Sequence, residues 1–198
     1  MAMKKVILNV ILCMILSTAT AQDDGKPLPN FTVNVNVLGL LQMGPIIQTE
    51  FRAGQSKGYV TPYLRLPYAG LLYQAIASEG FENKVSPAAL GLGLQYKVLI
   101  PKKIGAWYFS GGADYSFGAT KDNEGLWEGK HSYMAVLANG GYRWRNPNKK
   151  TVLNLGLMLG PALALRDNWW YYDYPSIKYD DSQNYFFIMG EFSFGWEK

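Results

Sequence analysis

The second half of the chain repeats one pattern, in which every second side chain is apolar until a turn ends the stretch. In the first stretch the apolar row is Ala88, Leu90, Leu92, Leu94, Tyr96, Val98 and Ile100. The opposing row consists of Ala89, Gly91, Gly93, Gln95 and Lys97. Successive side chains of a β-strand point to opposite faces, so this period of two predicts strands with one face in an apolar medium. Together with the export signal described next, we interpret that medium as lipid.

The first 21 residues have the composition of a secretory signal peptide. Lys4 and Lys5 form a positive start, residues 6–16 are an apolar run, and residues 19–21 (Ala-Thr-Ala) form a cleavage site. The apolar run is too short to cross a bilayer as a helix. Cleavage removes the only cysteine, Cys13. We therefore expect neither disulfides, nor thiolate catalysis, nor a cysteine-ligated metal in the mature chain.

Composition favours an all-β fold. The aromatic content of 15% and the 21 glycines suit strands, tight turns and close backbone approach. Removing Lys4 and Lys5 leaves 17 of the 19 basic residues against 15 acidic ones, so the net charge falls from +4 to +2. This weak charge gives no support to a nucleic-acid partner.

Turn-forming residues divide the mature chain into eight predicted strands. These strands cover 31–39, 44–54, 58–68, part of 70–99, 105–118, 131–145, 151–166 and 183–197. Short connections at 54–58, 101–104 and 146–150 alternate with longer ones at about 79–86, 119–130 and 167–182. Short turns on one side and long loops on the other are typical of outer-membrane barrels. We predict a short segment over 22–30 and one domain over 31–198, an antiparallel up-and-down eight-stranded transmembrane β-barrel.

The opening of this domain carries the only literal family motif. Residues 36–41 (Asn-Val-Leu-Gly-Leu-Leu) are followed by Gly44-Pro45 and by Glu50-Phe51-Arg52. With the strand pattern, this opening resembles small outer-membrane barrels of the OmpA and OmpX type, especially those of Bacteroidetes-type bacteria. The resemblance implies a place in the outer membrane of a Gram-negative bacterium, contact with its lipid and lipopolysaccharide, and insertion by the barrel assembly machinery.

The C-terminus departs from that family. Such barrels commonly finish on an aromatic residue that the assembly machinery recognises, whereas this chain finishes Trp196-Glu197-Lys198. The alternating Phe192, Phe194 and Trp196 are the residues that we expect to provide this signal, displaced by two positions.

Charged residues share the predicted inward face. An eight-stranded barrel is just wide enough for its side chains to fill it, and an isolated buried charge is very costly. We therefore predict a plug of paired charges, with a narrow ion path or a ligand-holding interior as the alternative. The network is assigned to Glu50, Arg52, Arg65, Lys97, Asp114, Arg143 and Glu191. The same face is predicted to hold Asn34, Asn36, Gln48, Gln95 and Arg166.

The predicted outer loop at 167–182 has an unusual aromatic composition. Rigid aromatic side chains provide large contact areas at small entropic cost, so they suit an extracellular glycan or a protein partner. The alternative is an aromatic girdle at the level of the lipid headgroups. The residues concerned are Trp169, Trp170, Tyr171, Tyr172 and Tyr174.

The sequence offers little catalytic chemistry. The only histidine, His131, lies beside Ser132. Neighbouring strand residues point to opposite faces, so the two cannot act as base and nucleophile without a bulge. The chain has no Gly-rich phosphate loop, metal-binding histidine cluster or nucleophile elbow. We predict a non-enzymatic barrel with a structural or surface-interaction role and without cofactor or metal. A narrow pore or lipid-A-modifying enzyme and a periplasmic lipocalin-like lipid-binding barrel are the alternatives.

Overall fold

The computed structural model describes residues 28–42, 44–67, 69, 85–102, 105–122, 127–146, 148–171, 174–180 and 184–198. The predicted signal peptide, most of the predicted segment 22–30 and the stretch 70–84 lie outside the described residues.

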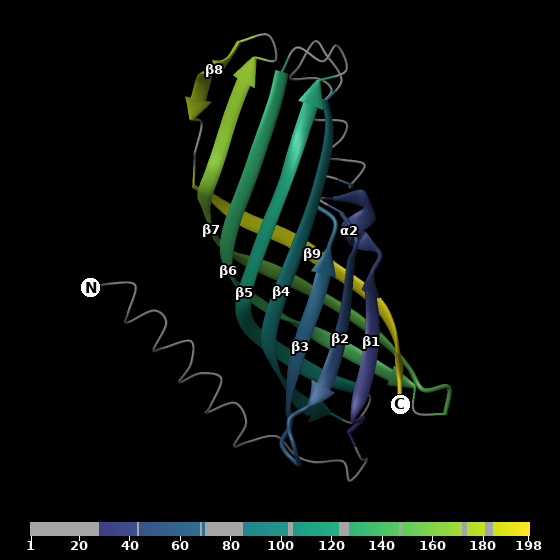
Figure 1. Ribbon diagram of the computed structural model, residues 1–198. Coiled ribbons are helices and arrows are strands. Elements are labelled where there is room, and N and C mark those ends of the chain that lie inside the picture. The colour runs from purple at the N-terminus through teal and green to yellow at the C-terminus, as the bar shows by residue number, and fades with distance from the viewer. Residues whose placement is uncertain are drawn as a thin grey trace, which may run out of the picture.

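Within these ranges, nine strands form a single sheet that closes on itself, and one short helix connects two of them (Figure 1). The elements are β1 (Phe31–Asn36), α2 (Leu38–Leu41), β2 (Ile46–Arg52), β3 (Gly58–Arg65), β4 (Val85–Lys102), β5 (Gly105–Asp122), β6 (Trp127–Asn146), β7 (Thr151–Tyr171), β8 (Tyr174–Asp180) and β9 (Tyr185–Glu197). The sheet order is β6-β5-β4-β3-β2-β1-β9-β7-β8, and β6 also pairs with β7. Eight antiparallel strands thus form an up-and-down ring, which confirms this part of the prediction, while β8 pairs with residues 168–171 of β7.

The register of the strands sets their tilt. Starting at Asn34 of β1, the paired residue on each successive strand from β2 to β7 can be followed around the ring to β9, where the path ends at Tyr185. On the other side of β1, however, Asn34 pairs directly with Gly195 of β9, so the ring closes with an offset along that strand. The residues passed on the way are Gln48, Tyr63, Gly93, Asp114, Ala135 and Ala162. A ring that closes with such an offset requires strands inclined to its axis, as Figure 1 shows.

The strands differ in length around the ring. β4, β5, β6 and β7 have 18, 18, 20 and 21 residues, whereas β1, β2 and β3 have 6, 7 and 8. The long strands continue past the ring at the end where β8 joins (Figure 1). The predicted connections 119–130 and 167–182 are therefore wrong, because most of both segments is strand. A strand is held in a sheet by its backbone hydrogen bonds and does not need apolar side chains. A prediction based on alternating apolar residues therefore misses strand ends that are polar.

The connection between β1 and β2 contains α2, which begins where we predicted the last two residues of the first strand, 31–39. The Asn36 Oδ1 accepts hydrogen bonds from the backbone nitrogens of Gly39 (3.3 Å) and Phe192 (3.2 Å). A side chain that binds nearby backbone groups competes with the extended conformation, so β1 ends here. Gly44 then turns the chain with a φ of 135°, which residues with a side chain rarely adopt. Across the described ranges, none of the helices combines the length and apolar character needed to cross a membrane.

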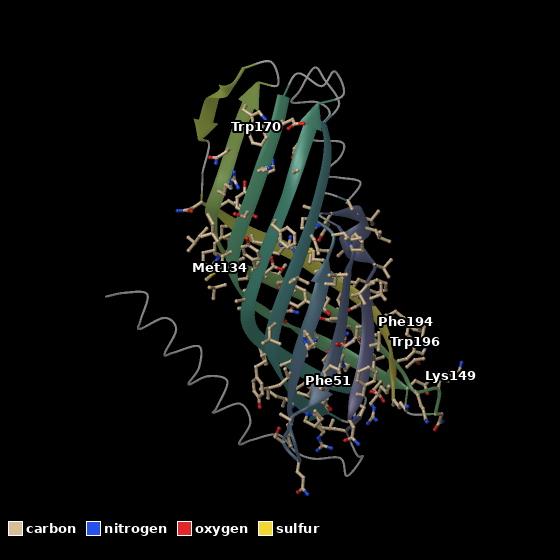
Figure 2. All side chains as sticks on the ribbon, in the orientation of Figure 1. Phe51, Met134, Lys149, Trp170, Phe194 and Trp196 are labelled. Atoms are coloured by element: carbon tan, nitrogen blue, oxygen red, sulfur yellow. The ribbon has the colours of Figure 1, made fainter. Side chains whose placement is uncertain are left out.

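The two faces of the ring have opposite chemistry. On β5, Phe109 and Tyr115 are exposed, whereas Ser110 and Asp114 between them are buried, as predicted. On β9, Phe192 and Phe194 are exposed on either side of a buried Ser193. Figure 2 shows Met134, Phe194 and Trp196 on the outside of the ring. The ring therefore places apolar side chains outward and polar side chains inward.

Two apolar clusters share the interior with these polar groups. One lies toward the end of the ring where β1 gives way to α2 and contains Ile46, Tyr63, Ala135, Leu137, Met158, Ala162, Phe187 and Met189. The other lies toward the end with the short turns and contains Tyr59, Leu99, Ala106 and Tyr108, with Leu28 packed against it. Tyr59 donates a hydrogen bond from its hydroxyl to the carbonyl oxygen of Pro29 (2.8 Å).

Candidate functional site

The interior polar network is centred on Glu50. Its carboxylate accepts a hydrogen bond from Lys97 Nζ (2.7 Å) and two from the terminal nitrogens of Arg143 (2.8 and 2.6 Å). All three side chains are almost completely buried. They come from β2, β4 and β6, so the ion pairs cross the interior. Buried charges persist only when they are paired and hydrogen-bonded, and this arrangement meets both conditions.

The second interior carboxylate, Glu191, is held by neutral donors. Its Oε1 accepts hydrogen bonds from Gln48 Nε2 (3.1 Å) and Ser193 Oγ (2.5 Å). Its Oε2 accepts them from the hydroxyl of Tyr108 (2.9 Å) and from Asn139 Nδ2 (2.6 Å). Four donors satisfy both oxygens of a carboxylate that is almost fully buried.

Two glycines allow Tyr108 to reach Glu191. In the strand register, Tyr108 pairs with Gly141, Gly141 with Gly156, and Gly156 with Glu191, so the four residues form one row across β5, β6, β7 and β9. A Cβ atom would lie 2.6 Å from the Tyr108 hydroxyl at Gly141 and 2.2 Å from it at Gly156. The tyrosine side chain therefore occupies the space that two side chains would otherwise fill.

A third charged group lies closer to the α2 end of the ring. Arg65 Nη2 contacts Asp114 Oδ1 (2.5 Å) and donates to Ser116 Oγ (2.6 Å). The Ser116 hydroxyl in turn donates to Asp114 Oδ1 (2.7 Å). The guanidinium carbon of Arg65 lies 5.1 Å from the ring centroid of Phe187, which adds a cation–π contact.

The first two groups are joined, and the interior charges balance. Arg143 Nε donates to Asn154 Oδ1 (2.7 Å), and Asn154 Nδ2 donates to Ser193 Oγ (3.2 Å), which itself binds Glu191. Among the described residues, Lys97, Arg143 and Arg65 stand against Glu50, Asp114 and Glu191, and a fourth buried carboxylate, Glu197 at the end of β9, is paired with Arg145 (2.6 Å). A charge-neutral, hydrogen-bonded interior is suited to filling the ring and holding its strands together.

The structure brings six of the seven predicted network residues into the interior and leaves Arg52 apart. Arg52 is the last residue of β2, and its guanidinium donates to the backbone oxygens of Leu28 (3.3 Å), Gln55 (3.3 Å) and Ser56 (2.9 Å). It therefore ties the β2–β3 turn to the segment before β1. The alternation of side chains places Arg52 in the inward row of β2, as predicted. Because Arg52 is at the end of this strand, it lies beyond the enclosed interior.

Several residues of the network were not assigned to it from the sequence. Tyr108, Asn139, Asn154 and Ser193 contribute the hydrogen bonds that satisfy the charged groups. They share the inward parity of the charged residues, which is the only sequence signal that identifies them.

Arg166 faces outward, contrary to our prediction. Ser132 pairs with Arg166 and the next residue, Tyr133, pairs with Ala164, so β7 has an extra residue at Leu165. Such a β-bulge shifts the alternation by one position. Arg166 is accordingly exposed.

The predicted aromatic loop is largely strand. Trp169, Trp170 and Tyr171 are in β7 and Tyr174 is in β8, while Tyr172 lies outside the described residues. Figure 2 shows Trp170 at the end of the long strands, away from the ring. Lys130 Nζ lies 5.6 Å from the centroid of the Trp170 ring.

The structure gives His131 a structural contact. His131 is buried, and its Nε2 lies 2.9 Å from Thr120 Oγ1 on the neighbouring strand. Ser132 belongs to the opposite face. Among the described residues no three His, Cys, Asp or Glu side chains are grouped so that they could hold a metal ion.

Comparison of the chain with protein-family models, curated proteins and solved structures finds no match.

Proposed function

We propose that this chain is a membrane-spanning β-barrel of the outer membrane of a Gram-negative bacterium, with a filled polar interior and a structural or surface-interaction role. The observation that carries the proposal is the inverted distribution of side chains, apolar outside and charged inside. Catalysis, cofactors and metals have no part in it.

The outer apolar surface is too extensive for water. Leu94, Leu165 and Ile188 are 56%, 57% and 63% exposed, and comparable side chains occur on every ring strand from β2 to β7 and on β9. Each half-exposed side chain forgoes about 1 kcal/mol of transfer free energy in water. Monomeric soluble proteins rarely expose contiguous apolar patches above a few hundred Å². Lipid is the medium in which such a surface is stable.

The height of the apolar surface fits a bilayer. On β5 it extends from Trp107 to Phe117, and at about 3.3 Å per residue with a tilt of about 40° these ten steps rise by about 25 Å. This value equals the height of about 25 Å that is usual for the apolar band of outer-membrane barrels.

Aromatic pairs lie at both margins of this surface. Near the short turns, the rings of Phe194 and Trp196 are 4.8 Å apart, and Tyr142 lies 4.9 Å from Trp144. At the other margin, the rings of Tyr115 and Phe117 are 5.8 Å apart. Aromatic side chains favour the two interfaces of a membrane, so these pairs support the same orientation. The short turns then face the periplasm, and the extended β5–β8 end, with Trp170, faces the exterior and its glycan or protein partners.

A lipid carrier and a pore fit the observed distribution of side chains less well than a filled membrane barrel does. A lipocalin-like carrier needs an apolar interior under a polar surface, which is the reverse arrangement. A pore needs an unfilled path, whereas Glu50, Lys97 and Arg143 bind one another across the interior. The resemblance to OmpA- and OmpX-type barrels supports insertion by the barrel assembly machinery into a membrane that contains lipopolysaccharide.

The proposal is tested by expressing the chain with its signal and fractionating the membranes. We expect a band in the outer-membrane fraction whose electrophoretic mobility in SDS differs between unboiled and boiled samples. Purified protein in planar bilayers should produce no steady conductance. Recovery as soluble periplasmic protein would refute the membrane barrel, and a regular conductance would refute the filled interior.

A further inference from the structure

The outer face of β6 and β7 carries a compact group of hydrogen-bond donors just beyond the ring. We call it the cationic patch, and it consists of Lys130, Ser132, Arg166 and Asn168. Lys130 pairs with Asn168 and Ser132 pairs with Arg166, in successive positions of the same face. Opposite residues of paired strands have Cβ atoms about 5 Å apart, and diagonal neighbours lie about 7–8 Å apart. An ammonium, a guanidinium, a hydroxyl and an amide can therefore converge on one oxyanion.

The β-bulge creates this patch. Because Leu165 is the extra residue in β7, Arg166 is turned from the inward to the outward row and comes to lie opposite Ser132. Without the bulge, Arg166 would continue the inward row of β7 and its guanidinium would face the interior. The bulge thus places a second positive charge beside that of Lys130.

The two cations are available to a ligand. Lys130 and Arg166 are exposed, and no carboxylate of the described residues forms an ion pair with either. The centroid of the Trp170 ring lies 5.6 Å from Lys130 Nζ, which adds a cation–π contact to the ammonium. The next acidic residue along β6, Glu128, lies opposite Trp170 at the far side of the patch.

The patch lies where lipid headgroups begin. The next outward-facing pair after Ser132 and Arg166, in the direction of the ring, consists of Met134 and Leu163, and both are exposed apolar side chains. Two residues along a tilted strand correspond to about 5 Å of height. The cations therefore lie directly above the margin of the apolar surface, at the depth of the phosphate groups.

We propose that the cationic patch binds the phosphate of an anionic lipid headgroup in the outer leaflet, an inference that rests on the proposed membrane barrel. The guanidinium of Arg166 binds two phosphate oxygens in its planar fork, and the ammonium of Lys130 binds as a point charge. The Ser132 hydroxyl and the Asn168 amide donate to the remaining oxygens, and the acyl chains pack on Met134 and Leu163.

The test uses the folded full chain in micelles of a neutral detergent. Phosphatidic acid, which has a phosphate headgroup, is titrated in, with diacylglycerol as the lipid that lacks it, and bound lipid is counted by native mass spectrometry. Wild type should prefer phosphatidic acid, and Lys130→Gln/Arg166→Gln should weaken that binding at least ten-fold. The matched control is Lys102→Gln/Lys149→Gln, which removes two exposed charges at the other end of the ring.

Each outcome decides the matter. Equal binding by wild type and Lys130→Gln/Arg166→Gln, or an equal loss in the control variant, would overturn the site. Inorganic phosphate that displaces phosphatidic acid at equal concentration would show that the ligand is free phosphate and overturn the lipid assignment. Incorporation of both wild type and variant into phosphatidylcholine vesicles is measured in parallel, so a failure of the membrane barrel itself is recognised separately.

Discussion

Replacing Glu50 with glutamine should be the most damaging isosteric change in the interior. The substitution keeps the size of the side chain but removes the charge that binds Lys97 and Arg143, both of which are almost fully buried. Removing one partner of a buried ion pair typically costs about 3–5 kcal/mol, because an uncompensated charge remains. Here two cations lose their partner, so we expect a loss of unfolding free energy of at least about 3 kcal/mol.

The assay is urea unfolding of the protein in lipid vesicles, followed by the heat-modifiable band. A second substitution tests the reasoning: Glu50→Gln/Lys97→Gln restores equal numbers of interior cations and carboxylates, so it should be more stable than Glu50→Gln alone. Lys149→Gln is the control, since Lys149 is exposed in the turn between β6 and β7, and interactions of exposed charges contribute about 1 kcal/mol or less. A loss below about 1 kcal/mol for Glu50→Gln, or no recovery in the double variant, would refute the paired-charge account.

Three further outcomes follow from the geometry. Gly156→Ala should destabilise the protein by about 1–3 kcal/mol in the same urea assay, because the added methyl group meets the Tyr108 hydroxyl and the backbone of Gly140. Leu157→Lys should cost about 2–4 kcal/mol in vesicles, because the outward side chain lies midway along the apolar surface; an unchanged stability would mean that it faces water. Deleting 168–180 should leave the heat-modifiable band intact, because the pairing of β7 with β9 ends at Ala162, and loss of that band would show that the extension is needed for assembly.

Most of the fold can be predicted from the alternation of apolar and polar side chains along the strands. On β5 and β9 the outward and inward rows follow directly from the sequence, because a strand has a period of two whatever its neighbours are. The same parity identifies the inward charges. The alternation gives the wrong face for Arg166, because a single extra residue in β7 exchanges the inward and outward rows beyond it. Nothing in the local sequence indicates that bulge.

The ends of the strands were predicted less well. The polar segment before Asp122 continues β5. The helix α2 replaces the end of the predicted first strand, where Asn36 binds both the helix and β9. These boundaries depend on which backbone groups find partners in another strand. A pattern of apolar residues does not contain that information.

By itself, the sequence determined that the chain forms antiparallel strands with one apolar and one polar face, and that carboxylates and cations share the polar face. Only the tertiary structure decided that Glu50 binds Lys97 and Arg143, while Glu191 is held by Tyr108 across two glycines. The physical reason is that the period of a strand is local, whereas the partners of a buried charge are set by register, tilt and closure. These bring together residues that lie up to 93 positions apart within the Glu50 group.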